Sequence, residues 1–294
     1  MTTPSVTGVS NNLFSILCML LASAFATSMM GFVRHLSDGG LHPFEIAFFR
    51  NFFGLILLLP LLWKFGMGSL KTDKFGLQAF RGVCNATSML LYFTAVTMIP
   101  IAKVSALNFT TPLFVTLGAV LVLRERMGIR RWTGLVLGFA GAIIILRPGL
   151  EIIHPGAMFA LASAFVWGTA VIIIKILSRT DSPFTITIYG ALFLTPITFV
   201  AALFFWRNPT LEELGWLIIL GALGSSAQFL FAQSLKGADA TLVMPFDFTK
   251  LIWASLIGYL FYAEIPVIWT WLGGGVIFTS AVYIAYRERL AERN

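Results

Sequence analysis

The sequence predicts an all-α integral membrane protein, with ten transmembrane helices arranged as two inverted five-helix repeats. Three observations support this fold class: a very apolar composition, ten apolar segments of membrane-spanning length, and short matches between the two halves of the chain. Of the 294 residues, 58% are hydrophobic and 11% are charged, against about 25% charged residues in an ordinary soluble domain. With a mean hydropathy of +0.88, a soluble domain is excluded, because one core could not bury so much apolar surface.

The net charge of +7 does not indicate a nucleic-acid partner. The Lys and Arg residues stand at the ends of the apolar segments, where membrane proteins place the basic residues that set their topology. The two cysteines, Cys18 and Cys84, lie inside apolar segments. This position is typical of small packing residues rather than of a disulfide framework.

The first five expected helices occupy residues 12–33, 43–63, 76–98, 100–123 and 129–146. Each is close to the roughly 20 apolar residues that a helix needs to cross a bilayer core. The first segment is too long for the apolar part of a signal peptide and has no basic residue before it, so we interpret it as a span. Pro43, Pro100 and Pro148 mark boundaries of these segments.

The last five expected helices occupy residues 155–177, 183–205, 214–234, 239–262 and 267–286. Prolines again mark most boundaries, at Pro155, Pro183, Pro209 and Pro266. All ten segments are continuously apolar and lack the alternation of a transmembrane β-strand, which favours a helical bundle. The longest connection, 64–75, is too short to hold a soluble domain.

The basic residues predict the orientation of the chain. With the N-terminus in the cytoplasm, fourteen Lys and Arg residues fall at cytoplasmic ends of the segments, and four fall at outer ends: Arg34, Lys103, Arg147 and Arg207. This bias predicts that both termini are cytoplasmic. We expect the membrane to be a bacterial inner (plasma) membrane.

Short matches relate the two halves of the chain at a nearly constant offset. The matches are LASAF at 21–25 and 161–165, HPFEI at 42–46 and SPFTI at 182–186, Phe109-Thr110 and Phe248-Thr249, and Glu125 and Glu264. The first two pairs are 140 residues apart and the others are 139 apart. They predict two repeats, residues 1–148 and 149–294.

Five helices are an odd number, so the second repeat must enter the membrane upside down. The loop after the fourth segment reads RERMGIRR, whereas its counterpart reads YAEIPVIW, without basic residues, as expected for a loop that faces outward. Inverted repeats are frequent in secondary transporters, which bind their substrate near the midplane between the halves. The alternative is a duplication that serves packing alone.

The chain resembles the drug/metabolite transporter (DMT) superfamily, specifically its ten-helix EamA-type transporters. The resemblance covers essentially the whole chain and rests on FFRNFFGLILLLP at 48–60, the run from FRGVCNATS to IILRPG at 80–149, and the similar run at 238–278. It implies alternating access around a cavity lined by the first, third, fourth, sixth, eighth and ninth helices. Members move small metabolites, and the arginines of FFRN and FRG are most similar to the branch with S-adenosylmethionine, riboflavin and carboxylate carriers.

Polar residues inside the third segment form a stripe at Arg81, Asn85, Ser88 and Tyr92. Their spacing of four, three and four residues puts them on one helical face, which lipid would not accept. We therefore expect this face to point inward and to bind substrate, with Gln228 on the equivalent face of the eighth segment. For Arg81 the alternative is a topology charge that reaches back to the membrane surface.

Asp247 and Lys250 lie near the middle of the ninth segment, three residues apart and on one face. The repeat maps them onto Asn108 and Thr111 of the fourth segment, so we predict that these four residues also bind substrate. The alternative is a closed structural ion pair. Two prolines, Pro112 and Pro245, are expected to loosen these helices and to expose backbone carbonyls to a cavity.

Glu45 and Arg50 in the second segment are expected to have structural or gating roles, with contact to the ligand as the alternative. Pro112 and Pro245 are also expected to be structural or gating. Trp167 and Tyr92 are candidates for stacking on a flat substrate, although packing is an alternative for both. The three histidines, His35, His42 and His154, stand apart near expected outer loops. No metal site and no cofactor are therefore predicted.

The sequence thus predicts a secondary transporter for a small polar metabolite, working by alternating access. Arg50, Arg81 and Lys250 outnumber Glu45 and Asp247 inside the membrane, which favours a substrate with a carboxylate or another anionic group, such as an amino acid, an organic anion or a nucleotide- or vitamin-like compound. The alternative is a channel or a metabolite-sensing membrane protein. An enzyme is not expected, and the glycines of the fifth and tenth segments allow a homodimer contact.

Overall fold

The computed structural model describes residues 6–65, 72–123, 129–147, 154–177, 180–181, 183–237 and 246–292, and every regular element in these ranges is a helix. The first half holds α1 (Val6–Asp38), α2 (Pro43–Phe65), α3 (Phe75–Met98), α4 (Ile101–Asn108), α5 (Thr111–Leu123) and α6 (Ile129–Leu146). The second half holds α7 (Pro155–Leu177), α8 (Pro183–Leu203), α9 (Leu211–Gly237), α11 (Thr249–Tyr262) and α12 (Ile268–Glu292).

The prediction of one continuous helix over 100–123 is wrong, because the chain breaks between α4 and α5 at Phe109 and Thr110. Proline has no N–H, so Pro112 cannot donate to the carbonyl of Asn108 as a continuous helix would require. Tight bonds replace the helical ones here: the Phe109 N–H donates to Ala106 and the Thr110 N–H donates to Leu107.

The second half has a similar interruption at Phe248. The residue stands in a turn directly before α11, with φ −62° and ψ −19°, close to the −62° and −8° of Phe109. The two phenyl rings stack on each other with centroids 5.3 Å apart. The breaks therefore meet in the centre of the bundle. Pro245 lies outside the described residues.

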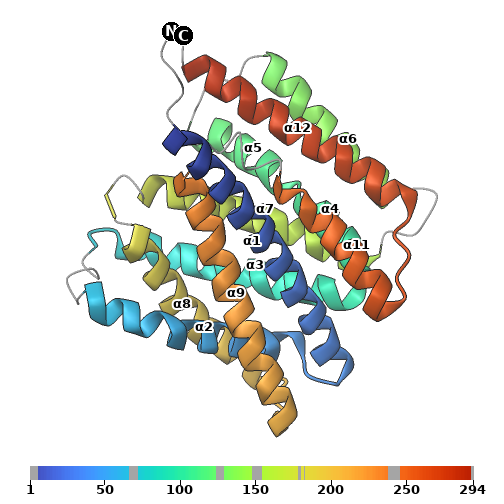
Figure 1. Ribbon diagram of the computed structural model, residues 1–294. Coiled ribbons are helices and arrows are strands. Elements are labelled where there is room, and N and C mark those ends of the chain that lie inside the picture. The colour runs from blue at the N-terminus through green and yellow to red at the C-terminus, as the bar shows by residue number, and fades with distance from the viewer. Residues whose placement is uncertain are drawn as a thin grey trace.

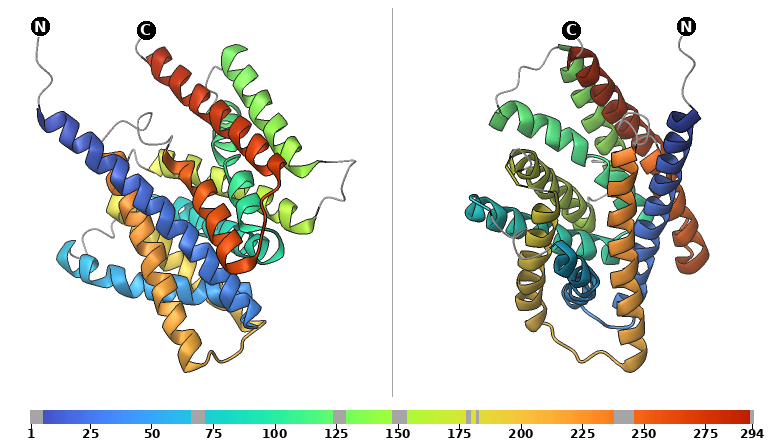
Figure 2. Two further views of the ribbon diagram at one scale, coloured as in Figure 1. Left: turned by 45° about the vertical axis from the view of Figure 1, so that its right-hand side comes forward. Right: turned by 60° about the vertical axis from the view of Figure 1, so that its left-hand side comes forward.

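The helices pack in a regular order of neighbours (Figures 1 and 2). α1 packs along α9, and α3 packs along α7. α2 packs against α8 and α9, while α8 packs against α2 and α3. α6 and α12 run side by side along one edge of the bundle, α2 and α8 lie at the opposite edge, and both termini lie at the same end (Figure 1).

The outer surface of the bundle is apolar. Large hydrophobic side chains on many helices are exposed, including Val136 on α6 (63%) and Phe261 on α11 (74%). Such broad apolar exposure would promote aggregation in water and fits contact with lipid. Among the described residues, three segments are long and apolar enough to cross a membrane, namely Leu13–Asp38, Pro155–Ile174 and Leu211–Phe231, and three shorter helices are also apolar.

Two carboxylates tie the connecting segments to helix ends. Glu45, in the first turn of α2, accepts hydrogen bonds from the N–H groups of His42 and Arg207, so it joins α2 to the segment between α8 and α9. Asp181, between α7 and α8, accepts from Thr72 and Gln78 at 2.7 Å each. Burial raises the pKa of the Asp181 carboxyl, but these hydrogen bonds outweigh burial and lower its pKa.

α6 and α12 cross at two glycines. A Cβ atom added to Gly141 would lie 2.7 Å from the carbonyl oxygen of Gly273, and one added to Gly273 would meet the carbonyl oxygen of Gly141. Close approach of backbones at small residues is the usual way in which helices associate in membranes. The glycines here serve a contact within the chain, and the homodimer stays a prediction.

We expect Gly141→Ala to lower the free energy of unfolding by about 1–3 kcal/mol, because its methyl group would push α6 away from the α12 backbone. Gly275→Ala on α12 is the matched control, since a Cβ there meets nothing within 4 Å. Thermal unfolding in detergent measures both changes. Equal stability of the two variants would contradict the close crossing.

Candidate functional site

A cavity of about 480 Å³ lies where the broken helices meet, within the roughly 300–1,000 Å³ of typical small-molecule sites. Its walls come from both halves of the chain. Polar side chains from seven helices and from Asp247, just before α11, face it, among apolar neighbours that include three methionines and several aromatic rings. The polar lining residues are Arg50, Asn85, Ser88, Tyr92, Ser105, Asn108, Thr111, Ser163, Trp167, Gln228, Asp247 and Lys250.

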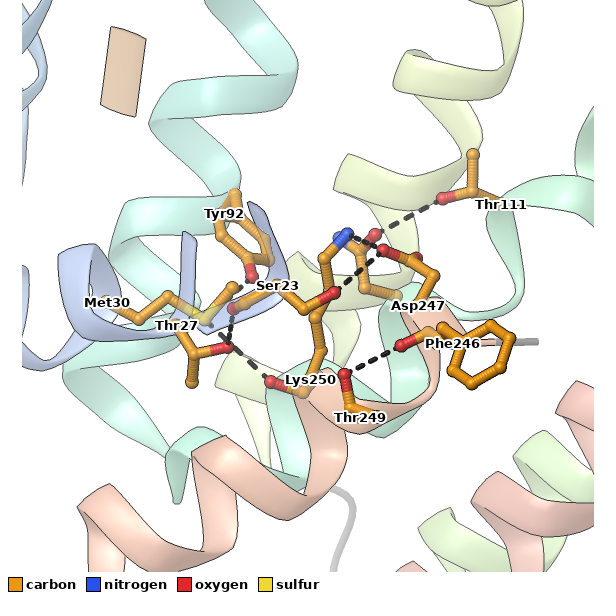
Figure 3. A network of polar contacts seen from close by, with 11 residues as sticks. Ser23, Thr27, Met30, Tyr92, Thr111, Phe246, Asp247, Thr249 and Lys250 are labelled. Carbon is orange, nitrogen blue, oxygen red and sulfur yellow. Dashed lines mark hydrogen bonds and ion pairs between the residues drawn. The ribbon is translucent and has the colours of Figure 1, made fainter. Parts of the chain in front are cut away.

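Asp247 and Lys250 form an ion pair at the break before α11 (Figure 3). The Lys250 ammonium lies 2.6 Å from Asp247 Oδ1, and the side chains keep 26% and 15% of their exposure, respectively. Ser23 of α1 reaches the same carboxylate oxygen at 3.5 Å, and the Lys250 ammonium lies 5.8 Å from the centre of the Phe231 ring. Two opposite charges thus share one side of the cavity.

Tyr92 of α3 and Ser105 of α4 approach the same sulfur atom, that of Met30 on α1. The Tyr92 hydroxyl donates to the Met30 sulfur at 3.0 Å, and Ser105 reaches that sulfur at 3.8 Å. At the break in the first half, Thr111 lies 3.5 Å from Asn108 Oδ1 (Figure 3). These bonds are long or involve sulfur, which is a weak acceptor, so the groups remain available to a ligand.

Ser88 of α3 and Ser163 of α7 hold their helices together. Each hydroxyl donates to the backbone carbonyl of the other residue, at 3.0 and 2.9 Å. Small residues with reciprocal bonds allow close packing. Both serines line the cavity, but their hydroxyls are already engaged.

Arg50 of α2 extends into the cavity. Its Nη1 donates to Asn51 Oδ1 at 2.8 Å, and its buried Nε has no hydrogen-bond partner among the described residues. Asn51 in turn donates to Thr198 of α8 at 3.4 Å. A Cβ atom added to Gly224 of α9 would lie 2.6 Å from Arg50 Nε, so this glycine leaves the space that the guanidinium occupies.

Most of the residues predicted to bind substrate face this one cavity. These are Asn85, Ser88, Tyr92, Asn108, Thr111, Trp167, Gln228, Asp247 and Lys250. Of the residues predicted to be structural or gating, Arg50 and Pro112 also line the cavity, whereas Glu45 lies at the helix end described above.

Arg81 is the predicted binding residue that does not line the cavity. It is 4% exposed and donates from Nη2 to the carbonyl of Ile186 on α8. A Cβ atom added to Gly190 of α8 would clash with its guanidinium. The side chain therefore points into the contact between α3 and α8.

Sequence reasoning missed two polar residues on the cavity wall, Ser105 and Ser163, and apolar ones that include Met29, Met30 and Met89. The methionines carry no polar pattern that separates them from packing residues. Ser163 could have been found, because it belongs to the LASAF repeat and matches Ser23. Among the described residues, no group of three His, Cys, Asp or Glu side chains is placed to hold a metal ion.

A second polar cluster, which we call the distal clasp, lies at the end of the bundle away from the termini. It consists of Arg34 on α1, and of Tyr262 and Glu264 at and after the end of α11. Arg34 forms an ion pair with Glu264, and the Tyr262 hydroxyl donates to the Gly31 carbonyl at 2.6 Å. The clasp thereby joins the two halves of the chain.

The segment between α3 and α4 completes the clasp. Arg34 also donates to the carbonyl of Ile99 at 3.1 Å, and Glu264 accepts the N–H of Ile101 at 2.9 Å. Met30 on α1 and Ser105 on α4 line the cavity one helical turn from Arg34 and Ile101, respectively. The clasp therefore lies one helical turn beyond the cavity wall at this end of the bundle.

The backbone conformation of Ala263 directs Glu264 toward the other residues of the clasp. Its φ of 52° and ψ of 27° are left-handed, a conformation that glycine adopts more readily than alanine at a helix end. The reversal lets the Glu264 N–H bond to the carbonyl of Gly258 at 2.9 Å. A side chain at Gly258 would strike the Glu264 carboxylate, so the local sequence leaves room for it.

Comparisons with known proteins agree with this architecture. The model of the EamA-like transporter family matches the chain twice, at residues 13–147 and 154–286. A solved crystal structure with 16% sequence identity superposes with a TM-score of 0.61 over 97% of this chain and 99% of that one, which shows a common fold.

Curated relatives are similar over most of the chain. A riboflavin transporter of Vibrio cholerae is 33% identical over 86% of this chain and 86% of its own. An S-adenosylmethionine uptake transporter of Rickettsia bellii is 31% identical over 85% and 86%. A pseudopaline exporter of Pseudomonas aeruginosa is 28% identical over 93% and 96%.

The ion pair in the cavity gives a test of its energetics. We expect Asp247→Asn or Lys250→Met alone to cost about 2 kcal/mol of stability, because each leaves one uncompensated charge; fully buried pairs cost about 3–5 kcal/mol. The double variant should cost less than the sum of the two single changes. Thermal unfolding of the four proteins measures the cycle, and additive losses would mean that the two side chains do not interact.

Proposed function

This chain belongs to the EamA-like transporter family, and we propose that it is a secondary carrier of a small, flat metabolite across the bacterial inner membrane by alternating access. The observation that carries this proposal is the cavity of about 480 Å³ between two broken helices, with an ion pair and several uncommitted polar groups on its walls. Charges at this depth are costly, so they are expected where a polar ligand binds.

The named substrates of the relatives support a substrate with a flat nitrogen heterocycle. Riboflavin and S-adenosylmethionine both join such a ring to a hydroxylated carbon chain or sugar. The cavity offers aromatic faces at Tyr92 and Trp167 for the ring. Asn108, Thr111 and Gln228 supply donors and acceptors for hydroxyl groups.

We propose the two inverted repeats, residues 1–148 and 149–294, as the basis of the transport cycle. Three observations support them: the family model matches each half separately, the breaks at Phe109 and Phe248 occupy matching positions, and the order of packing is reciprocal. The repeat relates α1, α2 and α3 to α7, α8 and α9. The contact of α1 with α9 therefore corresponds to that of α7 with α3, and the contact of α2 with α9 corresponds to that of α8 with α3.

The proposed binding residues are those predicted side chains that face the cavity, with Arg50 taking the place of Arg81. Asp247 and Lys250 bind charged or strongly polar groups, and Asn85 offers a buried carbonyl oxygen that has no partner among the described residues. Ser88 positions α3 against α7. Glu45 and Pro112 keep structural roles, at the start of α2 and at the break in the first half.

The distal clasp supports a state that is closed on the outer side. With both termini in the cytoplasm, as the basic residues predict, the clasp lies at the outer end of the cavity. In the first repeat, the residue that matches Glu264 of the clasp is Glu125, which lies outside the described residues. Alternating access then requires the clasp to open when the cytoplasmic end closes.

We expect saturable counterflow in proteoliposomes. Vesicles preloaded with unlabelled riboflavin or S-adenosylmethionine should transiently accumulate the labelled compound, because a carrier exchanges one bound molecule for another. Lys250→Ala should lower the exchange rate by about tenfold or more, through loss of a binding group worth at least about 1.4 kcal/mol. Gly275→Ala is the control, since it lies away from the cavity and meets no neighbour.

A linear, unsaturated flux or an ohmic current would contradict the carrier and favour a channel. Binding of ligand without any flux would favour a sensing protein.

The clasp can be tested by cross-linking Arg34→Cys to Glu264→Cys in a Cys18→Ala, Cys84→Ala background. A short, reducible bifunctional thiol reagent should abolish counterflow, because the outer end of the cavity could no longer open. Reduction should restore it, and the untreated double-cysteine variant is the control. Full exchange by the cross-linked protein would show that the clasp need not open.

A further inference from the structure

The charges that line the cavity do not balance. Lys250 and Asp247 neutralise each other at 2.6 Å, which leaves Arg50 as a positive charge. Among the described residues, no carboxylate lies within ion-pair distance of Arg50. An arginine side chain stays protonated in proteins, so this charge persists inside the bundle.

The hydrogen bonds of Arg50 do not compensate for its position. A guanidinium carries five N–H donors, and the neutral amide oxygen of Asn51 takes one of them. The Nε–H is buried without a partner among the described residues. An unsatisfied buried donor on a charged group is expensive, so a ligand that supplies an anionic acceptor would gain free energy here.

Arg81, an arginine with a packing role, provides a comparison for Arg50. The two contacts, α2 with α9 and α3 with α8, each contain one arginine against a glycine: Arg50 against Gly224, and Arg81 against Gly190. Arg81 also has a buried Nε without a partner among the described residues, but its Nη2 donates to a backbone carbonyl of the facing helix and the residue does not line the cavity. Within the part of the chain that the structure describes, Arg50 donates only to its neighbour Asn51, and it does line the cavity.

The surroundings of Arg50 fit the anionic end of a flat molecule. The guanidinium lies against Gly224, with the Met29 sulfur beside it, and its residue lines the cavity together with Asn85 of α3. Asn85 holds an unpartnered carbonyl oxygen, among the described residues, that can accept an N–H of a heterocycle. The planar guanidinium forms paired bonds with carboxylates and phosphates alike.

We propose that Arg50 binds the anionic group of the transported metabolite, a carboxylate or phosphate attached to a flat heterocycle. This assignment rests on the proposed carrier function. It gives α2, a helix outside the set that the family resemblance places around the cavity, a direct part in substrate selection. Lys250 and Asp247 then bind the remaining polar groups of the same molecule.

The test compares matched neutral and anionic ligands on the purified full-length protein. The pairs are riboflavin and its 5′-phosphate, adenosine and its 5′-monophosphate, and nicotinamide and nicotinate. The first two pairs add a phosphate, and the third contrasts a carboxylate with an amide. Dissociation constants are measured by ligand-induced thermal shift for wild type, Arg50→Gln, Arg50→Lys and Arg81→Gln.

We expect wild type to bind the anionic member of at least one pair about tenfold tighter than its neutral partner, the range of a charge-assisted hydrogen-bond pair. Arg50→Gln should reduce that ratio to about one, and Arg50→Lys should keep part of it. Arg81→Gln should lower the melting temperature and leave the ratio unchanged. If Arg50→Gln does not fold, Gly224→Ala, which displaces the guanidinium, should lower the ratio instead.

Three outcomes would overturn the assignment: neutral ligands that bind wild type as tightly as anionic ones, a ratio that survives Arg50→Gln, or no binding by any anionic member. Counterflow of a neutral ligand with no anionic preference would refute the role of Arg50 and leave the carrier function intact. Absence of counterflow despite an Arg50-dependent ratio would refute the carrier and keep the anion site.

Discussion

The ion pair between Lys250 and Asp247 organises the cavity of this protein, because a charge buried in an apolar bundle costs less when an opposite charge lies beside it. The break at Phe248 brings both side chains to the cavity instead of to lipid. The break at Phe109 brings Asn108 and Thr111 to the same space from the other half. The outer surface of the helices can then remain apolar, as the exposed side chains of α6 and α11 illustrate.

Much of this architecture could be predicted from the sequence, because lipid imposes simple rules on composition. Segments of apolar residues gave the helices, and polar residues inside them identified the inward faces of α3 and α11. The break in 100–123 could not be placed from apolarity alone. It follows from Pro112, whose missing N–H interrupts the helix four residues after Asn108, although the sequence does indicate that Pro112 loosens this region.

The sequence could not predict which of the two arginines, Arg50 or Arg81, lines the cavity. Both lie inside apolar segments, and periodicity put Arg81 on the same face as Asn85 and Ser88. Whether a long side chain reaches a cavity depends on the facing helix. Each arginine lies against a glycine of that helix, but Arg81 donates to the α8 backbone whereas Arg50 lines the cavity. A partner helix distant in the sequence decides this, so spacing within one segment cannot reveal it.

The distal clasp and the cavity connect structure to transport through the same helices. α1 carries Met30 in the cavity wall and Arg34 in the clasp, one turn apart. A ligand that moves α1 relative to α11 would therefore act on both places. The clasp bonds converge on Glu264, which follows a left-handed turn at Ala263.

The most direct test of this account is the accessibility of one cavity residue from both faces of the membrane. A cysteine in place of Gln228, in a protein without Cys18 and Cys84, is treated in oriented vesicles with an impermeant thiol reagent from either side. The account predicts modification from both sides, slowed from both by a transported ligand. Modification from one side alone, with or without ligand, would contradict alternating access through this cavity.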